Sequence, residues 1–305
     1  MKLLVGHTGF VGSNLKEQVH FDGLYNSQNI SEAFGTNPDW LVYSGVRAEK
    51  FLANSEPEKD FGIILDAMSN IQKINPKKII LISTVDVYPN PVEVNEATPP
   101  NPENHAYGKN RLYLENWVAE NFTDYLIVRL PALFGKNLKK NFIYDLIQIV
   151  PAMLNEQKFS ELSAANNWLH EYYSQQENGF YKLNPIAPEA KTALKQRFLD
   201  LGFTALNFTD SRGVFQFYNL KDLWADIEIA LQQHIKVLNL ATEPVSVNEI
   251  YNALYHEDFI NEILPVAPRY DFRTIHAKHF DGTPQYIRRK GVILDGIKQF
   301  ISESV

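Results

Sequence analysis

The sequence contains no cysteine, which excludes disulfide bonds, a thiolate nucleophile and a thiolate metal site. It also has no apolar run long enough to cross a bilayer. Residues 1–12 form a short strand pattern followed by glycines, without the basic region and cleavage site of a secretory signal. We therefore expect a cytoplasmic protein that does not contact a membrane.

The sequence has fewer basic than acidic residues, 29 against 36, and its net charge is -7. This balance argues against nonspecific binding of nucleic acid, which relies on surplus Lys and Arg. The remaining composition is typical of a globular protein, with 45% hydrophobic residues. A chain of 305 residues is long enough for one domain and an additional lobe.

Strand and helix patterns alternate through the first half of the chain. Strand patterns cover residues 2–5, 39–44, 78–83 and 124–130, and helical patterns cover 10–19, 61–74 and 107–120. This alternation predicts an α/β fold with a doubly wound parallel sheet of the Rossmann type.

The alternation stops after about Gly135. A mostly helical stretch follows, and strand and helix patterns resume near residue 215. We therefore predict two interleaved units with these bounds: a Rossmann domain of residues 1–140, completed by about 214–243, and a smaller, mainly helical substrate-binding lobe of residues 141–213 and 244–305.

A GxxGxxG turn follows the first strand pattern. Gly6 permits a tight turn, Gly9 lets the backbone approach a pyrophosphate, and Gly12 lets the helix pack closely on the strand. The start of the helix then faces the phosphates, which predicts binding of NAD or NADP. A purely structural glycine turn is the alternative. The predicted cofactor contacts in this segment are Gly6, Thr8, Gly9, Phe10, Val11 and Gly12.

The acidic residue that commonly follows the second strand is missing. Residues 23–27 read GLYNS and offer Asn26 and Ser27 in its place. Because no carboxylate is present to hold the ribose hydroxyls or to repel a phosphate, the choice between NAD and NADP stays open.

Hydroxyl side chains end one strand pattern and open the next helix. Ser83 and Thr84 lie at the carboxyl end of the strand, where ligands bind in such sheets, and Tyr107 can reach the same crevice. If Thr84 and Tyr107 meet over a nicotinamide, Tyr107 can exchange a proton with a substrate hydroxyl while Thr84 bonds the same oxygen. A capping Thr and a packed Tyr are the alternatives.

Together these segments resemble the extended short-chain dehydrogenase/reductase superfamily, specifically its nucleotide-sugar epimerases, dehydratases and reductases. GHTGFVGSNL resembles its cofactor turn, ISTVDVY its active-site strand and HAYGKNRLYLE its YxxxK segment. VRLPALFG, FQFYNLKDLW and LNLATEPVSVNEI are similar to its later elements. The resemblance implies an NAD(P)-dependent epimerase or reductase of a nucleotide-activated sugar, paired as a homodimer through two Rossmann helices.

The resemblance places Thr84 and Tyr107 at the catalytic hydroxyl and tyrosine positions. It adds further cofactor contacts at Ser44, Gly45 and Val46 beside the phosphates, and at Leu130, Pro131 and Ala132 near the nicotinamide. Arg111 stands where the family has a lysine that holds the nicotinamide ribose and lowers the pKa of the tyrosine. Arg111 keeps the charge and can contact the ribose, but it cannot relay a proton.

Asp86 is the last catalytic candidate. The family's sugar dehydratases carry an Asp-Glu pair directly after the Thr, whereas this chain has Val85 and Asp86. Asp86 can act as a lone acid or base, or it is a hydrogen-bonded carboxylate near the crevice. Elimination therefore ranks below oxidation, reduction or epimerisation.

Arginines outside the Rossmann pattern are candidates for a substrate diphosphate, because guanidinium groups suit phosphate oxygens. The predicted substrate contacts are Arg212 and Arg273, and the pair Arg288 and Arg289 is a further candidate. The spacing of the histidines predicts no metal site. Two other functions remain open: a catalytically impaired NAD(P)-binding sensor or scaffold, which Arg111 favours, and a reductase of a small carbonyl compound.

Overall fold

The structure is a computed structural model that describes residues 1–102 and 105–304. A six-stranded sheet lies at its centre, in the order β12-β5-β4-β3-β1-β2 with every neighbouring pair parallel. Its strands are β1 (Lys2–Val5), β2 (Gly23–Tyr25), β3 (Trp40–Tyr43), β4 (Lys78–Thr84), β5 (Tyr125–Leu130) and β12 (Val237–Asn239). The predicted doubly wound α/β fold is confirmed.

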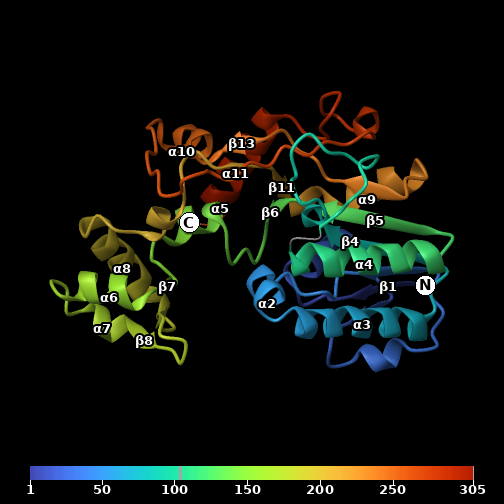
Figure 1. Cartoon of the computed structure of the whole chain (residues 1–305), viewed down its shortest axis with the longest axis horizontal. Coiled ribbons are helices and arrows are strands. Elements are labelled where there is room, and N and C mark those ends of the chain that lie inside the picture. Colours follow the sequence, from blue (N-terminus) through green and yellow to red (C-terminus); the bar gives the residue numbers. More distant parts are fainter. Residues whose placement is uncertain (103–104, 305) are drawn as a thin grey trace.

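Helices cover both faces of this sheet (Figure 1). One face packs on α1 (Phe10–Gln18) and α9 (Leu223–Gln232), and the other on α3 (Pro57–Ile74) and α4 (Ala106–Asn121). Successive strand residues point to opposite faces, so Leu4 joins the first core while Leu3 and Val5 join the second. Because both faces are buried, the strands are apolar throughout, which is why the sequence pattern predicts them.

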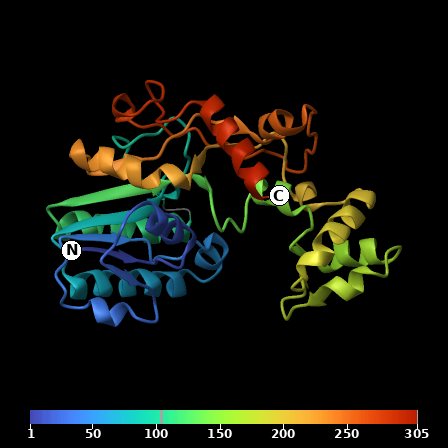
Figure 2. The ribbon, with the colours of Figure 1, turned by 180° about the vertical axis from the view of Figure 1, so that it is seen from behind.

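A separate lobe projects from the sheet domain (Figures 1 and 2). Its elements are β7 (Met153–Leu154), α6 (Glu156–Ser163), α7 (Leu169–Tyr172), β8 (Tyr173–Gln175), β9 (Tyr181–Leu183) and α8 (Pro188–Asp200). The lobe has its own core, in which Phe159 stacks on Tyr181 with ring centres 3.8 Å apart and Phe198 is fully buried. The three short strands form an antiparallel sheet that the predicted helical stretch did not include.

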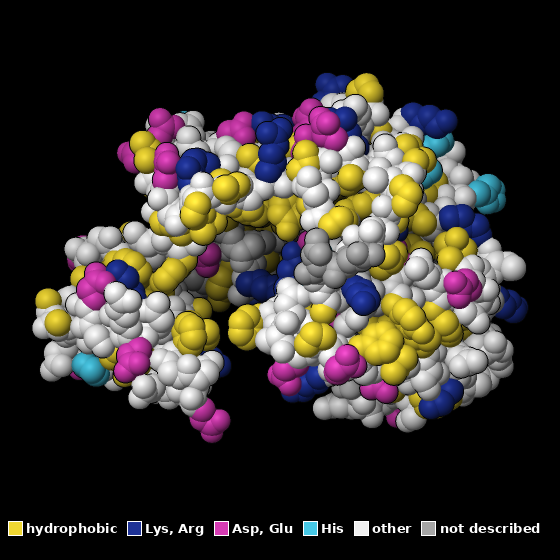
Figure 3. Space-filling view, viewed as in Figure 1, with side chains coloured by type: hydrophobic (Ala, Val, Ile, Leu, Met, Phe, Trp, Pro, Cys, Tyr) yellow, Lys and Arg dark blue, Asp and Glu magenta, His cyan; other side chains and the backbone are white. Residues whose placement is uncertain are grey.

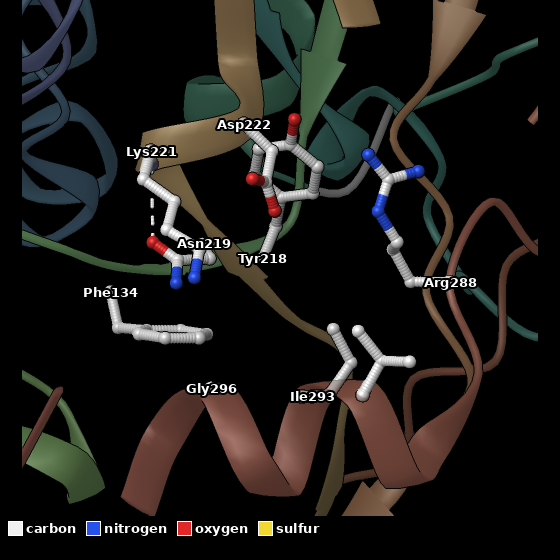
Figure 4. Close-up of a pocket in the computed structure, with 9 residues that line it drawn as sticks. Phe134, Tyr218, Asn219, Lys221, Asp222, Arg288, Ile293 and Gly296 are labelled. Carbon is white, nitrogen blue, oxygen red and sulfur yellow. Dashed lines mark hydrogen bonds between the residues drawn. The ribbon is translucent and has the colours of Figure 1, made fainter. Parts of the chain in front are cut away.

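A third core joins the lobe to the sheet domain. It is built by β6 (Ala132–Phe134), α5 (Phe142–Gln148), β10 (Val214–Phe215), β11 (Phe217–Asn219), β13 (Val245–Ser246), α10 (Val247–Tyr255) and α11 (Lys290–Ser304). β11 pairs in parallel with β6, and β10 pairs antiparallel with β13. Figure 4 shows Phe134 over Gly296 of α11, beside a cavity of about 40 Å³ that has room only for water-sized molecules. The predicted domain bounds stay a prediction.

The remaining elements are short. Helix α2 (Lys50–Ser55) precedes α3, and 3₁₀ turns cover Ile30–Ala33, Val85–Val87, Ala205–Phe208, Leu220–Asp222 and Ala277–His279. Within the part of the chain that the structure describes, no helix has the length and apolar character needed to cross a membrane.

The buried face of α4 is unusual because it carries charge. Glu115 accepts hydrogen bonds from the Arg129 guanidinium of β5, with Nη2 to Oε2 at 2.6 Å, and from the Ser83 hydroxyl. Arg129 also donates to the Tyr88 hydroxyl at 2.7 Å. The Arg129 and Glu115 side chains are only 6% and 2% exposed. This network fixes α4 on the sheet by ionic contacts as well as apolar ones.

We predict that Glu115→Gln lowers the free energy of unfolding by about 3 kcal/mol, because it leaves a buried guanidinium without its counter-charge. Urea denaturation measures the change. Glu161→Gln on α6 is the matched control, because Glu161 pairs with Lys158 at an exposed position and should change stability by less than about 0.5 kcal/mol. Equal effects of the two substitutions would contradict a structural role for the Glu115 pair.

Candidate active site

The glycine turn closes tightly between β1 and α1. Gly6 has φ +90°, and a Cβ there would lie 2.5 Å from the Ser44 carbonyl oxygen. A Cβ on Gly12 would lie 2.2 Å from the Gly6 oxygen, so both positions require glycine. In the described structure the first turn of α1 has no acidic residue and no side-chain cap, which leaves its N–H groups available to an anion.

The predicted phosphate-side loop lies beside this turn. The Ser44 backbone N–H and hydroxyl both donate to the Val5 oxygen at 2.9 Å, and the ideal Gly6 Cβ would lie 2.9 Å from the Gly45 nitrogen. At the end of β2, the Asn26 side chain accepts from the Gln28 N–H at 2.8 Å. That turn contains neither a carboxylate nor a cation, so it discriminates by charge against neither NAD nor NADP.

Thr84 and Tyr107 meet at the carboxyl edge of the sheet. Thr84 is the last residue of β4, and its hydroxyl lies close enough to the Tyr107 phenol to oppose the rise of the Tyr107 pKa. The Thr84 Oγ1 also accepts from the Asp86 N–H and donates to Asp86 Oδ2, both at 3.2 Å. The Tyr107 N–H donates to Asn54 Oδ1 at 3.2 Å, which fixes the first turn of α4.

Gly108 allows this meeting. A Cβ on Gly108 would lie 2.1 Å from the Asp86 carbonyl oxygen, so the helix packs directly on the turn that follows β4. The Gly108 N–H donates to His105 Nδ1 at 3.0 Å, which caps the helix. The close packing carries Tyr107 to Thr84.

Arg111 lies one helical turn beyond Tyr107. Its guanidinium is ion-paired with Asp60 of α3, donates to the Arg47 carbonyl at 2.6 Å, and lies 4.1 Å from the centre of the Tyr107 ring. Arg111 and Asp60 are 5% and 1% exposed. The predicted cation is therefore in contact with Tyr107, but protein groups hold it firmly. Its contact with a ribose stays a prediction.

Sequence reasoning missed Lys50 and Tyr270. Lys50 Nζ lies 2.7 Å from Asp86 Oδ2 and 3.4 Å from the Tyr270 hydroxyl, and 5.8 Å from the centre of the Tyr107 ring. The Tyr270 hydroxyl donates to Asp86 Oδ1 at 3.4 Å. One signal could have indicated Lys50. It follows the loop at Ser44 that was already a predicted cofactor contact, and the replacement of the family lysine by Arg111 was a reason to look for another cation nearby.

The pKa of Tyr107 reflects these neighbours. Burial raises the pKa of its phenol above the ordinary value; the Arg111 guanidinium opposes the rise, and the Asp86 carboxylate adds to it. Lys50 and the nearby Thr84 hydroxyl oppose it to a smaller extent. Tyr107 is therefore a protonated donor at neutral pH.

The other predicted cofactor contacts lie at different places around the edge. Leu130 ends β5 directly opposite Thr84 in the strand register, and Pro131 follows it. Thr8 is exposed on the glycine turn. Ser83 donates its hydroxyl to Glu115, so this side chain is engaged in the network beneath α4.

Three of the four candidate substrate arginines are bound to carboxylates, and the fourth, Arg289, donates to the Gly282 carbonyl oxygen at 3.2 Å. Arg212 donates twice to Asp210, with Nη2 to Oδ2 at 2.8 Å, and Arg273 pairs with Glu93 at 2.8 Å. Arg288 pairs with buried Asp226 at 2.7 Å. Contact of Arg212 and Arg273 with a diphosphate stays a prediction. Over residues 1–102 and 105–304, no group of three or more His, Asp or Glu side chains could hold a metal ion.

Figure 3 shows an open hollow between the lobe and the rest of the molecule, with Lys or Arg side chains at its rim and apolar side chains above it. The carboxyl edge of the sheet brings together a glycine turn with uncapped helix N–H groups, the phenol of Tyr107 and the hydroxyl of Thr84. Those groups can hold a phosphorylated ligand and move a proton at one of its oxygens.

Comparison with known proteins gives one family and one fold. The family model described as "RmlD substrate binding domain" matches residues 1–158, more than half of the chain. No curated protein matches the sequence.

Several solved structures are similar over 99% of this chain. They include dTDP-4-dehydrorhamnose reductase from Yersinia enterocolitica, with 15% identity, 99% of that chain covered and a TM-score of 0.62. RMD from Pseudomonas aeruginosa, complexed with NADPH, has 15% identity, 98% coverage and a TM-score of 0.62. UDP-glucose 4-epimerase from Thermotoga maritima, solved with UDP-glucose, has 15% identity, 98% coverage and a TM-score of 0.59. At such identity the likeness shows a shared fold.

We predict that Gly108→Ala lowers the free energy of unfolding by about 2 kcal/mol, because the added methyl group forces α4 away from the Asp86 carbonyl. Gly62→Ala in α3 is the matched control: its Cβ would meet nothing within 4 Å, and alanine should stabilise the helix by up to about 1 kcal/mol. Urea denaturation compares the two variants. A Gly108→Ala protein as stable as the native chain would contradict the close packing.

Proposed function

The chain belongs to the RmlD substrate binding domain family, and from that premise we propose that it is an NAD(P)-dependent reductase or epimerase of a nucleotide-activated sugar. Its membership agrees with the resemblance to the extended short-chain dehydrogenase/reductase superfamily. The observation that carries the proposal is the closeness of the Thr84 and Tyr107 side chains at the sheet edge that also carries the glycine turn.

The glycine turn fits a dinucleotide cofactor. Gly6 and Gly12 leave no space for a Cβ, and α1 begins without an acidic side chain, so a pyrophosphate would meet backbone N–H groups and no repelling charge. Ser44 and Gly45 border the same turn. When bound, NAD(P) supplies or accepts a hydride.

The residues of the chain supply the proton chemistry. Tyr107 holds a proton at Oη and gives it to the substrate oxygen during reduction, or receives it during oxidation. Thr84 donates to the same oxygen and orients it. Arg111 stacks on the Tyr107 ring and limits its movement, while its charge stabilises the phenolate.

The substrate class follows from the family and from the shape of the molecule. The Yersinia protein is named as a reductase of a dTDP-linked sugar, and the Thermotoga epimerase was solved with UDP-glucose. A hollow lies beside the lobe (Figure 3), and it is the place we propose for a nucleotide-linked sugar. Reduction and epimerisation both use these groups, and the nucleotide is left to experiment.

A homodimer through α3 and α4 is part of the proposal. Leu65 and Tyr113 on these helices leave 46% and 48% of their surface exposed, and Phe61 packs edge-on against Tyr113. These apolar side chains on the outer surface of the two helices support pairing there.

The experiment is titration with NADH and NADPH, followed by nicotinamide fluorescence, and then turnover assays with UDP-, dTDP- and GDP-sugars. We predict that Tyr107→Phe lowers turnover by about 10²–10⁴-fold while cofactor affinity stays unchanged, because only the proton donor is lost. Tyr255→Phe is the control, since Tyr255 lies exposed on α10. Failure to bind either cofactor would overturn the proposal.

One observation favours a second function, a cofactor-binding sensor or scaffold without turnover: Asp60 and the Arg47 carbonyl hold the cation that stands in place of the family lysine. On the proposed function, Arg111→Lys keeps measurable turnover, since lysine also places a positive charge beside Tyr107, but it loses the planar stacking of the guanidinium on the ring. Steady-state assays of both proteins decide. Turnover by the variant alone would identify the native chain as a binding protein.

A further inference from the structure

Three side chains from distant segments meet beside Tyr107, and we call them the edge cluster. They are Lys50, the first residue of α2; Asp86, in the 3₁₀ turn after β4; and Tyr270, in the segment after α10. Lys50 Nζ lies 2.7 Å from Asp86 Oδ2 and 3.4 Å from the Tyr270 hydroxyl. It also lies 5.8 Å from the centre of the Tyr107 ring and 5.9 Å from that of Tyr270. The ammonium group therefore stands between the two phenol rings.

The ion pair in this cluster is open to solvent. The Lys50 side chain is 50% exposed, and that of Asp86 is 15% exposed. An ion pair that water can reach contributes little to stability. Asp86 Oδ2 lies only 3.2 Å from Thr84 Oγ1, so the pair adjoins the oxygen that the proposed function assigns to the reacting centre. Its position suits contact with a ligand better than stabilisation of the fold.

The hydrogen-bonding capacity of the cluster is not used up. A lysine ammonium has three N–H donors, and over the described part of the chain that of Lys50 has two acceptors, Asp86 and Tyr270. A carboxylate has about four acceptor positions. That of Asp86 receives three donors from the described residues, namely the other two members of the cluster and Thr84. One N–H donor and one acceptor position are therefore left side by side.

A neighbouring donor and acceptor suit a pair of hydroxyl groups on adjacent carbons. One hydroxyl oxygen accepts from Lys50, and the other hydroxyl donates to Asp86. The two charges of the ion pair cancel, so the cluster offers no net attraction to a phosphate or a carboxylate. The ligand chemistry that fits is a neutral vicinal diol.

Tyr270 holds the carboxylate in place for such a contact. Its ring stacks on that of Phe215 with the centres 5.7 Å apart, and its hydroxyl donates to Asp86 Oδ1 at 3.4 Å. The cluster therefore has one wall from the sheet domain and one from the C-terminal half of the chain.

We propose that the edge cluster is a binding subsite for a vicinal diol of a sugar; this deepens the proposed function and rests on it. Lys50 donates to one hydroxyl oxygen, and Asp86 accepts from the neighbouring hydroxyl. Two ligands of the proposed function carry such a diol: the sugar of the substrate and the nicotinamide ribose of the cofactor. Binding of either one leaves Thr84 and Tyr107 to the adjoining oxygen.

The first test is titration of Lys50→Met and Asp86→Ala with NADH and NADPH, followed by nicotinamide fluorescence. If the diol is that of the ribose, each substitution raises the Kd by about 10-fold or more, because each removes a hydrogen bond to a charged group. Charge alone would act in opposite directions on these anionic cofactors: Lys50→Met would weaken binding and Asp86→Ala would strengthen it.

The second test is calorimetric titration with UDP-glucose, dTDP-glucose and GDP-mannose at saturating NADH. These sugars carry hydroxyl groups in place of a carbonyl, so NADH cannot reduce them and binding is measured at equilibrium. If the diol is that of the substrate, both substitutions raise the Kd of the nucleotide sugar by about 10-fold or more, while the Kd of NADH changes little.

The matched controls are Lys77→Met and Asp39→Ala. Lys77 and Asp39 form an ion pair of the same length, 2.7 Å, but they precede β4 and β3 and so lie at the opposite edge of the sheet. These substitutions should leave every Kd unchanged. Thermal denaturation of all four variants shows whether a loss of affinity comes from unfolding, and Asp86→Asn, which keeps the size of the side chain, replaces Asp86→Ala if that variant melts earlier.

Native affinity of Lys50→Met for every ligand, or tighter binding by Asp86→Ala, would overturn the subsite. A failure of the proposed function is recognised separately. If the native chain binds neither cofactor, the proposed function fails and the subsite falls with it. If the native chain binds a cofactor and a nucleotide sugar and the substitutions leave both affinities intact, the subsite alone is wrong.

Discussion

The charged buried face of α4 is the constraint on which the site depends. Two buried ion pairs, Arg111 with Asp60 and Glu115 with Arg129, tie the helix to α3 and to β5. Burying a charge costs free energy unless its partner is in place. These pairs therefore hold α4 in one rotation about its axis and in one position along the sheet. An apolar contact surface would allow α4 to slide by small amounts. Tyr107, in the first turn, therefore has one position relative to the carboxyl edge.

The edge gathers groups that are far apart in the chain. The glycine turn follows β1, Thr84 ends β4, and Lys50 opens a short helix that lies near neither in sequence. Parallel strands bring their carboxyl ends to one edge, which explains why the turn and the hydroxyl meet. Asp86 then joins the sheet domain to the C-terminal segment through Tyr270, so the site includes a residue from beyond the Rossmann pattern.

The sequence predicted those features of the structure that depend on short local patterns. The strands that are buried on both faces and the GxxGxxG turn each follow from a short segment of sequence. The placing of Thr84 near Tyr107 follows from the rule that ligands bind at the carboxyl ends of parallel strands. It could not predict the partner of Arg111, because Asp60 lies 51 residues away on another helix. Sequence reasoning missed Lys50 for the same reason, because its partner Asp86 lies on a distant segment of the chain. The strands β7, β8 and β9 are too short, at two or three residues each, for an alternating pattern to be visible.

The separate core of the lobe has an evolutionary consequence. Phe159, Tyr181 and Phe198 pack among themselves and share no cluster with the six-stranded sheet. Substitutions in that core can remodel the lobe while the register of the sheet, and with it the spacing of Thr84 and Tyr107, stays as it is. Natural variation can therefore accumulate in the lobe faster than in the sheet domain, and related chains can differ there while they share the same sheet edge.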